Sequence, residues 1–169
     1  MGYVHDTHFA QSIPLEAMSF VTGTWTPTLA SNVLSMDRTA ADSSSTIFIP
    51  VMIPSNASAF KGAKLVDIDV HYGIFTAAAD DFATVELEKI TFNADGTLAT
   101  GAAVSVTLDA DHDTAAERKA ADEHKMTVTL DTPAWIDDDE AYYLELIVDC
   151  GAATVFKMFG AVVHYELRA

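Results

Sequence analysis

The clearest hydrophobic pattern in the chain lies near its C-terminal end, over residues 140–167. Apolar and polar positions alternate there with a period of two, which is typical of a strand that covers a core with one face. The first strand has its apolar face at Tyr142, Leu144, Leu146, Val148 and Cys150. After a turn over 151–153, a second strand is largely apolar on both faces as far as Val163. We therefore expect the second strand to be central in a sheet.

Each face of this second strand can be assigned from the alternation. One face carries Phe156, Met158, Val162, His164 and Glu166. The opposite face carries Val155, Phe159, Ala161, Val163, Tyr165 and Leu167.

The same period recurs through the middle of the chain. It is cleanest over residues 64–75, where Asp67, Asp69 and His71 are expected to face outward from an apolar strand. Further strands are predicted by residues 47–53, with a bulge or a crossing between sheets at Pro50, and by 84–92, with a bulge near Glu88 and Lys89. Others are predicted around Trp25, at 104–108 and at 126–130, and Pro27 places the Trp25 strand at a sheet edge or strand end.

One helical segment interrupts the strands. Residues 113–123 are rich in alanine, and Asp113 or Thr114 can cap the helix at its start. Eight or nine short strands separated by turns, with this one short helix in a loop, predict an all-β fold. We expect an antiparallel β-sandwich over residues 24–169, with a jelly roll as the preferred topology and no second domain.

Residues 1–23 follow no clear period and are assigned to an N-terminal arm. An arm packed on a neighbouring subunit and a strand tied to the domain's own edge would both produce this pattern. Because the domain has ample strands without it, we expect the arm to pack across a subunit boundary or onto a larger assembly. The residues assigned to that interface are the apolar ones: Tyr3, Phe9, Ile13, Leu15, Met18 and Phe20.

Charge narrows the choice of partners. The chain of 169 residues has 9 Lys and Arg against 25 Asp and Glu, a formal balance of 9 − 25 = −16. Such a negative field repels phosphates, so neither nucleic acid nor an anionic membrane is expected as a partner. The N-terminal residues lack the basic and apolar regions of a secretion signal, and no apolar run reaches the roughly 18 residues of a membrane helix. The single Cys150 excludes an intramolecular disulfide and is expected to be buried.

Candidate metal ligands occur at Asp109, Asp111 and Asp113, since alternating carboxylates can supply oxygen ligands to Ca²⁺. Thr114 and Ala120 stand where an EF-hand loop needs glycine and a bidentate glutamate, and an acidic helix start explains the same residues. No metal or other cofactor is therefore expected.

Catalytic motifs are equally scarce in the sequence. It contains neither a Gly-x-Ser-x-Gly elbow nor a glycine-rich phosphate loop. His71, His164 and Glu166 lie on expected strands without the compact motif of cupin enzymes. We expect a protein that is not an enzyme.

Two stretches carry a family resemblance: TWTPTLASNVLSMDRTAADSSSTIFIPVMIPSNASAFKGAKLVDIDVHYGI and the ending TVFKMFGAVVHYELRA. With them, residues 24–169 resemble small acidic structural proteins of tailed bacteriophages. The resemblance implies a virion component made in the host cytoplasm, most simply a capsid decoration protein that binds the major capsid protein or another part of the virion. It also implies a symmetric homo-oligomer, with a trimer favoured, and brings no catalytic residues with it.

A second hypothesis comes from another class of protein, a carbohydrate- or receptor-binding β-sandwich module. Trp25, Trp135 and Tyr143 could form an exposed platform on which sugar rings stack. Tryptophans that fill gaps between sheets or subunits would explain the same residues.

Overall fold

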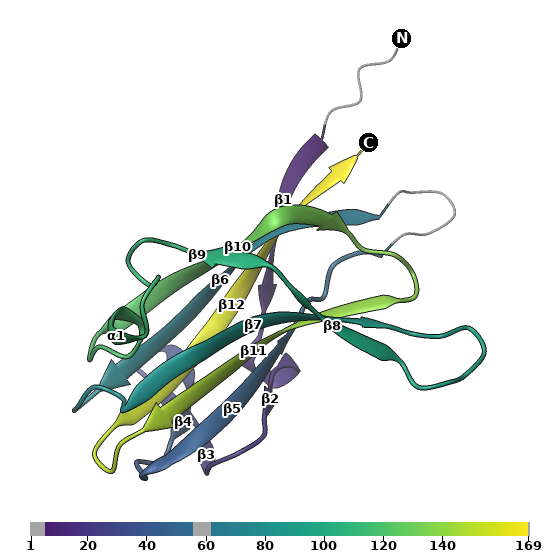
Figure 1. Ribbon diagram of the computed structural model, residues 1–169. Helices are drawn as coiled ribbons and strands as arrows, with labels where there is room; N and C mark the ends of the chain where they lie inside the picture. The colour runs from purple at the N-terminus through teal and green to yellow at the C-terminus, as the bar shows by residue number, and fades with distance from the viewer. Residues whose placement is uncertain (1–5, 56–61, 169) are drawn as a thin grey trace.

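A computed structural model describes residues 6–55 and 62–168 and shows two antiparallel β-sheets packed face to face (Figure 1). The elements are β1 (Asp6–Ile13), a 3₁₀ turn (Leu15–Ala17), β2 (Ser19–Phe20), β3 (Trp25–Ala30), β4 (Val33–Arg38), β5 (Ser43–Pro50), β6 (Ala63–Phe75), β7 (Asp81–Thr91), β8 (Thr100–Val104), β9 (Val106–Leu108), α1 (Ala115–Arg118), β10 (Glu123–Trp135), β11 (Glu140–Cys150) and β12 (Val155–Arg168).

The strands form two sheets in nested pairs. Sheet A has the order β3-β4-β12-β6-β10-β9, with β1 also paired to β12, and sheet B has the order β2-β5-β11-β7-β8. Along the chain, β4 pairs with β12, β5 with β11, β6 with β10 and β7 with β8, so each pair encloses the next. A long antiparallel ribbon rolled on itself gives this nesting. The fold is therefore the expected jelly-roll β-sandwich.

The core lies between the inner faces of the two sheets, as the alternation predicted. Every second residue of β11 from Tyr142 to Cys150 is buried, and so is the inner face of β6. Burial raises the pKa of the Cys150 thiol, which agrees with the expected buried cysteine. Together these two strands supply 10 of the 26 buried residues of the hydrophobic core in the described part of the chain.

β12 differs from its expected pattern at one point. Phe156 and Met158 face the core, but so do Ala161 and Val163, which lie an odd number of residues further on. The register with β6 shifts between Met158 and Gly160, and Gly160 has a φ of +150°. This bulge reverses the alternation, so Phe159 lies on the outer face with Val162 and not on the same face as Ala161 and Val163, as expected.

The bulge expected near Glu88 and Lys89 is also elsewhere. The ladder between β7 and β11 is continuous from Thr84 to Thr91, and its register shifts nearer the start of β7, between Thr84 and Asp81. Phe92 is therefore exposed outside the strand, while Lys89 forms an ion pair with Glu140.

The helix is one turn long. Thr114 caps it as expected, in a reciprocal capping box with Glu117, and the turn lies at the end of the sandwich opposite the start of β1 and the end of β12 (Figure 1). No helix within the described residues is long and apolar enough to cross a membrane.

The N-terminal segment belongs to the sandwich. β1 pairs with β12 from Asp6 to Ile13, and Ile13, Leu15 and Met18 are buried in the same core as the strands. Residues 6–23 therefore do not stand apart from the domain as the expected arm would. Pairing with an edge of the domain's own sheet, the alternative left open by the sequence, describes them.

Candidate functional site

The outer face of sheet A carries a group of polar side chains on its central strands. β6 lies between β10 and β12, and the register places Asp67 beside Thr129 and His164, and Asp69 beside Thr127 and Val162. The side chains of a strand alternate between its two faces, so Asp67 and Asp69 both point outward, as expected from the sequence. Neighbouring strands thus build a polar surface from residues far apart in the chain.

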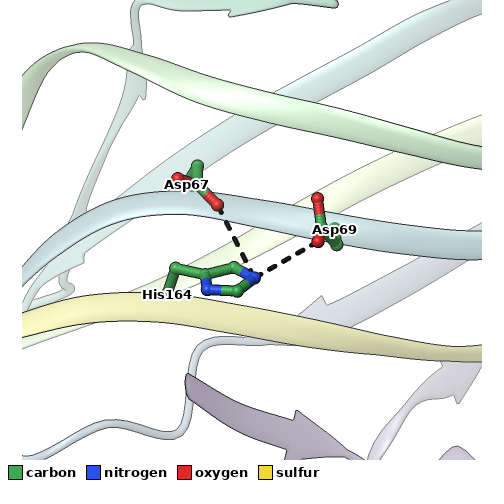
Figure 2. A group of neighbouring side chains, drawn as sticks. All are labelled: Asp67, Asp69 and His164. Carbon is green, nitrogen blue, oxygen red and sulfur yellow. Dashed lines mark hydrogen bonds and ion pairs between the residues drawn. The ribbon is translucent and has the colours of Figure 1, made fainter. Parts of the chain in front are cut away.

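Asp67, Asp69 and His164 form a compact group on this face (Figure 2). The His164 Nε2 atom lies 3.2 Å from Asp69 Oδ2 and 3.9 Å from Asp67 Oδ1. Asp69 also accepts a hydrogen bond of 2.7 Å from the Thr127 hydroxyl, and the Lys125 ammonium lies 2.8 Å from its Oδ2 atom. The three residues are the one group of three or more potential metal ligands found in the described part of the chain.

The environment shifts the pKa values of these two carboxyl groups in opposite directions. Burial, helped by the neighbouring charge of Asp69, raises the pKa of Asp67. Burial also disfavours the charged form of Asp69, but hydrogen bonds from Lys125, Thr127 and His164 outweigh it and lower the pKa of Asp69. Asp69 is therefore the better compensated of the two carboxylates.

A depression of about 640 Å³ adjoins this group on sheet A. Its lining includes Ser12, His71, Glu123, Lys125, Phe159 and Val162. The bulge at Gly160 forms part of the wall and turns Phe159 outward.

Two aromatic rings lie at one end of this face. A Cβ atom on Gly73 would stand 2.5 Å from the Phe75 ring and 3.2 Å from the Phe159 ring. The rings therefore cover Gly73 on the outer side of β6, and only glycine leaves room for them. Ring surface thus stands near the ionisable groups of His71, Glu123 and Lys125.

The carboxylates proposed from the sequence as a calcium site lie elsewhere and do not converge. Asp109 accepts hydrogen bonds from the backbone N–H groups of Asp111 and Thr127 and contacts the His112 ring at 2.7 Å. Asp113 instead interacts with Glu117, whose charge helps to raise its pKa. Asp113 and Glu117 therefore lie at the start of α1, as an acidic helix start requires, whereas Asp109 links His112 to the backbone of β10.

The residues expected at a subunit interface divide into three groups. Ile13, Leu15 and Met18 are buried in the chain's own core, and Phe20 packs against Trp25 with ring centroids 4.7 Å apart. Phe9 is 42% exposed and stacks on Tyr165. Tyr3 lies outside the described residues. Of the described five, Phe9 retains the largest surface for a partner.

The three aromatic residues of the stacking hypothesis do not share a face. Trp25 packs edge-on against Phe156 at the rim of the core, and its Nε1 donates a hydrogen bond to the Thr22 carbonyl oxygen. Trp135 ends β10 in sheet A, whereas Tyr143 faces outward from sheet B against Phe48. They form no common platform.

Sequence reasoning missed the grouping of Asp67, Asp69 and His164, although it placed the two aspartates on an outer face. The spacing Asp-x-Asp on a strand was the available signal. His164 is 95 positions away from Asp69, and only the β6–β12 register brings them together.

Comparisons with known proteins identify no family: no family model and no curated protein matches the chain. Similar solved structures include a carbohydrate-binding module of the β-sandwich superfamily described as promiscuous in specificity (13% identity, 92% of this chain, TM-score 0.41). A second is the structure of the CBM22-1–GH10 modules of Clostridium thermocellum xylanase 10B with xylohexaose (8% identity, 100% of this chain, TM-score 0.45). A third is the xylan-binding module CBM86 from Roseburia intestinalis (11% identity, 95% of this chain, TM-score 0.36). The chain spans 55%, 29% and 96% of these three structures, respectively. The fold assignment rests on the strand order described above.

Proposed function

We propose that the protein is a non-enzymatic binding module that takes a carbohydrate on the outer face of sheet A. The observation that carries the proposal is the combination, beside one depression, of two outward phenyl rings with His71, Glu123 and Lys125. Sugars offer apolar C–H faces to aromatic rings and hydroxyl groups to charged and polar side chains. This part of the surface provides both kinds of contact.

The position of these groups on strands favours an extended ligand. Phe75 and Asp67 mark the two ends of the polar and aromatic face along β6, about 26 Å apart at roughly 3.3 Å per residue. Because β6 and β12 are central strands, their side chains are held in place before a ligand arrives, which lowers the entropic cost of binding.

The arrangement of the carboxylates favours binding over hydrolysis. Opposite pKa shifts in two neighbouring carboxyl groups occur in glycosidases, where the two groups flank the bond to be broken. Asp67 and Asp69 instead project from one face of one strand and approach a ligand from the same side. They are therefore suited to hydrogen bonding with the hydroxyl groups of a sugar. Hydrolysis would need one carboxyl group on each side of the glycosidic bond.

Removal of one ring tests the proposal. Phe159→Ala should weaken binding to the best ligand of a glycan panel by about tenfold, because an aromatic contact contributes roughly 0.5–1.5 kcal/mol beyond its buried area. The measurement is isothermal titration with the soluble oligosaccharide. Phe48→Ala is the matched control, since it removes a half-buried ring from the outer face of sheet B.

The control also defines the opposite result. If Phe48→Ala weakens binding and Phe159→Ala does not, the ligand lies on sheet B. If no glycan binds the wild-type protein, the carbohydrate proposal is wrong.

The virion role implied by the resemblance stays a prediction, as does a trimer. None of the contacts described above favours a capsid partner over a sugar. Co-purification with phage capsids would test that role independently of glycan binding.

A further inference from the structure

We propose that Asp67, Asp69 and His164 bind one divalent transition-metal ion, with zinc as the ion to test. The inference goes beyond carbohydrate binding, and it rests on the ligand atoms, their spacing and the contacts that orient them. The carboxylates come from β6 and the imidazole from β12.

The spacing of the ligand atoms fits a small ion. With metal–ligand bonds of about 2.0–2.2 Å, the corners of a tetrahedron lie about 3.3–3.6 Å apart. The His164 Nε2 atom is 3.2 Å from Asp69 Oδ2 and 3.9 Å from Asp67 Oδ1, and all three ligand atoms lie within 4.8 Å of one another. Small side-chain rotations therefore suffice to bring three ligands around one ion. The fourth position faces outward, where water or a ligand oxygen can occupy it.

Neighbouring residues orient the ligand side chains of this group, as hydrogen-bond partners outside the ligands do in a metal site. Thr127 donates its hydroxyl hydrogen bond to Asp69 Oδ1, which leaves Oδ2 directed toward His164. Outer hydrogen bonds of this kind fix the orientation of ligating carboxylates. Register shifts in the β6–β12 ladder lie on both sides of this group, and between them the pairs Asp69–Val162 and Asp67–His164 share one register.

The ligand set selects the class of ion. An imidazole nitrogen with two carboxylate oxygens suits zinc and similar transition ions, whereas Ca²⁺ and Mg²⁺ prefer oxygen ligands throughout. Binding forms one Nε2–metal bond and two carboxylate–metal bonds, and any proton held on Nε2 leaves to solvent.

Lys125 takes the place of the ion when none is bound. Its ammonium lies 2.8 Å from Asp69 Oδ2, yet its side chain is 57% exposed and is free to swing into water. A metal ion that binds the oriented Asp69 carboxylate would displace this flexible ammonium group. Lys125 is therefore expected to compete with the metal.

Isothermal titration of the full chain with zinc alone tests the site. Wild type should bind one ion per chain, and both His164→Ala and Asp67→Asn should lower the affinity by roughly tenfold or more. Lys125→Met should bind zinc more tightly than wild type, a result that a purely structural ion-pair network would not give. Circular dichroism of each variant checks that it is folded.

His8→Ala is the control, because His8 is an exposed histidine on the neighbouring strand β1, where it approaches Glu166 and not the group. It should bind zinc like wild type. If wild type takes up no zinc, or if His8→Ala removes the binding while His164→Ala does not, the proposed site is wrong. Because no sugar is present, neither result depends on the carbohydrate proposal.

Discussion

Two buried arginines donate hydrogen bonds to backbone carbonyl oxygens of loops and of a neighbouring strand. Arg38, at the end of β4, donates hydrogen bonds to the carbonyl oxygens of Thr39, Ala41 and Ser43. Arg118, at the end of α1, donates to the carbonyl oxygens of Phe82, Ala83 and His112. A guanidinium suits this task because its planar fork offers five donors in fixed directions.

Arg118→Met should destabilise the protein by about 3–5 kcal/mol, since it leaves several buried carbonyl oxygens without a donor. Urea unfolding followed by tryptophan fluorescence measures the change. Lys119→Met is the control: the adjacent Lys119 makes one exposed bond to the Asp80 carbonyl oxygen, so its loss should change stability by less than about 1 kcal/mol. Equal effects in the two variants would contradict this account of Arg118.

Among the strands, β12 shows which structural features hydrophobic alternation predicts and which it does not. Its existence, length and central place follow from its apolar residues, and alternation also places Ala161, Val163 and Tyr165 on one common face. Alternation could not predict that Phe156 and Met158 share the inner face with these residues. The bulge between them shifts the alternation by one residue, and amino-acid composition does not reveal such a shift. Gly160 was the one local signal, as glycine inside a strand often marks a bulge.

Gly160→Ala should destabilise the protein by about 1–3 kcal/mol, because its φ of +150° is unfavourable for any residue with a side chain. Steric overlap is not the reason, since the nearest atom beyond the adjoining residues would be the Ile13 carbonyl oxygen, 3.6 Å from the new Cβ. Thermal unfolding measures the effect. Gly101→Ala in β8 meets nothing within 4 Å and should be neutral or slightly stabilising. A stable Gly160→Ala protein would show that the bulge tolerates other residues.

The candidate site was predictable only in part. Alternation along β6 placed Asp67 and Asp69 outward, but alternation says nothing about which strand lies alongside. The contact with His164 depends on a register between distant strands that is itself offset by a bulge. The acidic group around Asp109 stood out more clearly in the sequence, yet its oxygens are engaged by nearby N–H groups.

At the scale of the whole molecule, the N-terminal segment closes the sandwich. Three of its side chains, Ile13, Leu15 and Met18, are buried in the core. No hydrophobic period is visible there because residues 6–20 form a strand, a 3₁₀ turn and a two-residue strand in succession. The fold class was nevertheless predictable, since strands from β5 to β12 carry the alternation and most of the core.

Deletion of residues 1–18 should therefore leave a chain that does not fold stably as a dilute monomer. Loss of three buried side chains removes roughly 5–9 kcal/mol at about 1.5–3 kcal/mol each, which is comparable with the total stability of many domains. Circular dichroism with light scattering measures fold and association together. A folded truncated protein with weakened self-association would restore the interpretation of this segment as an arm for a partner.

The antiparallel pairing of β1 with β12 also determines how the protein would respond to mechanical load. Asp6 pairs with Arg168, so the outer ends of both strands emerge at the same end of the sandwich (Figure 1). The hydrogen bonds between antiparallel strands run perpendicular to them. A force that draws these two ends apart would act along those bonds and open them one pair after another, as a zip opens. The first element to detach would be β1, which would uncover an edge of β12 while the nested strands beneath it remained paired.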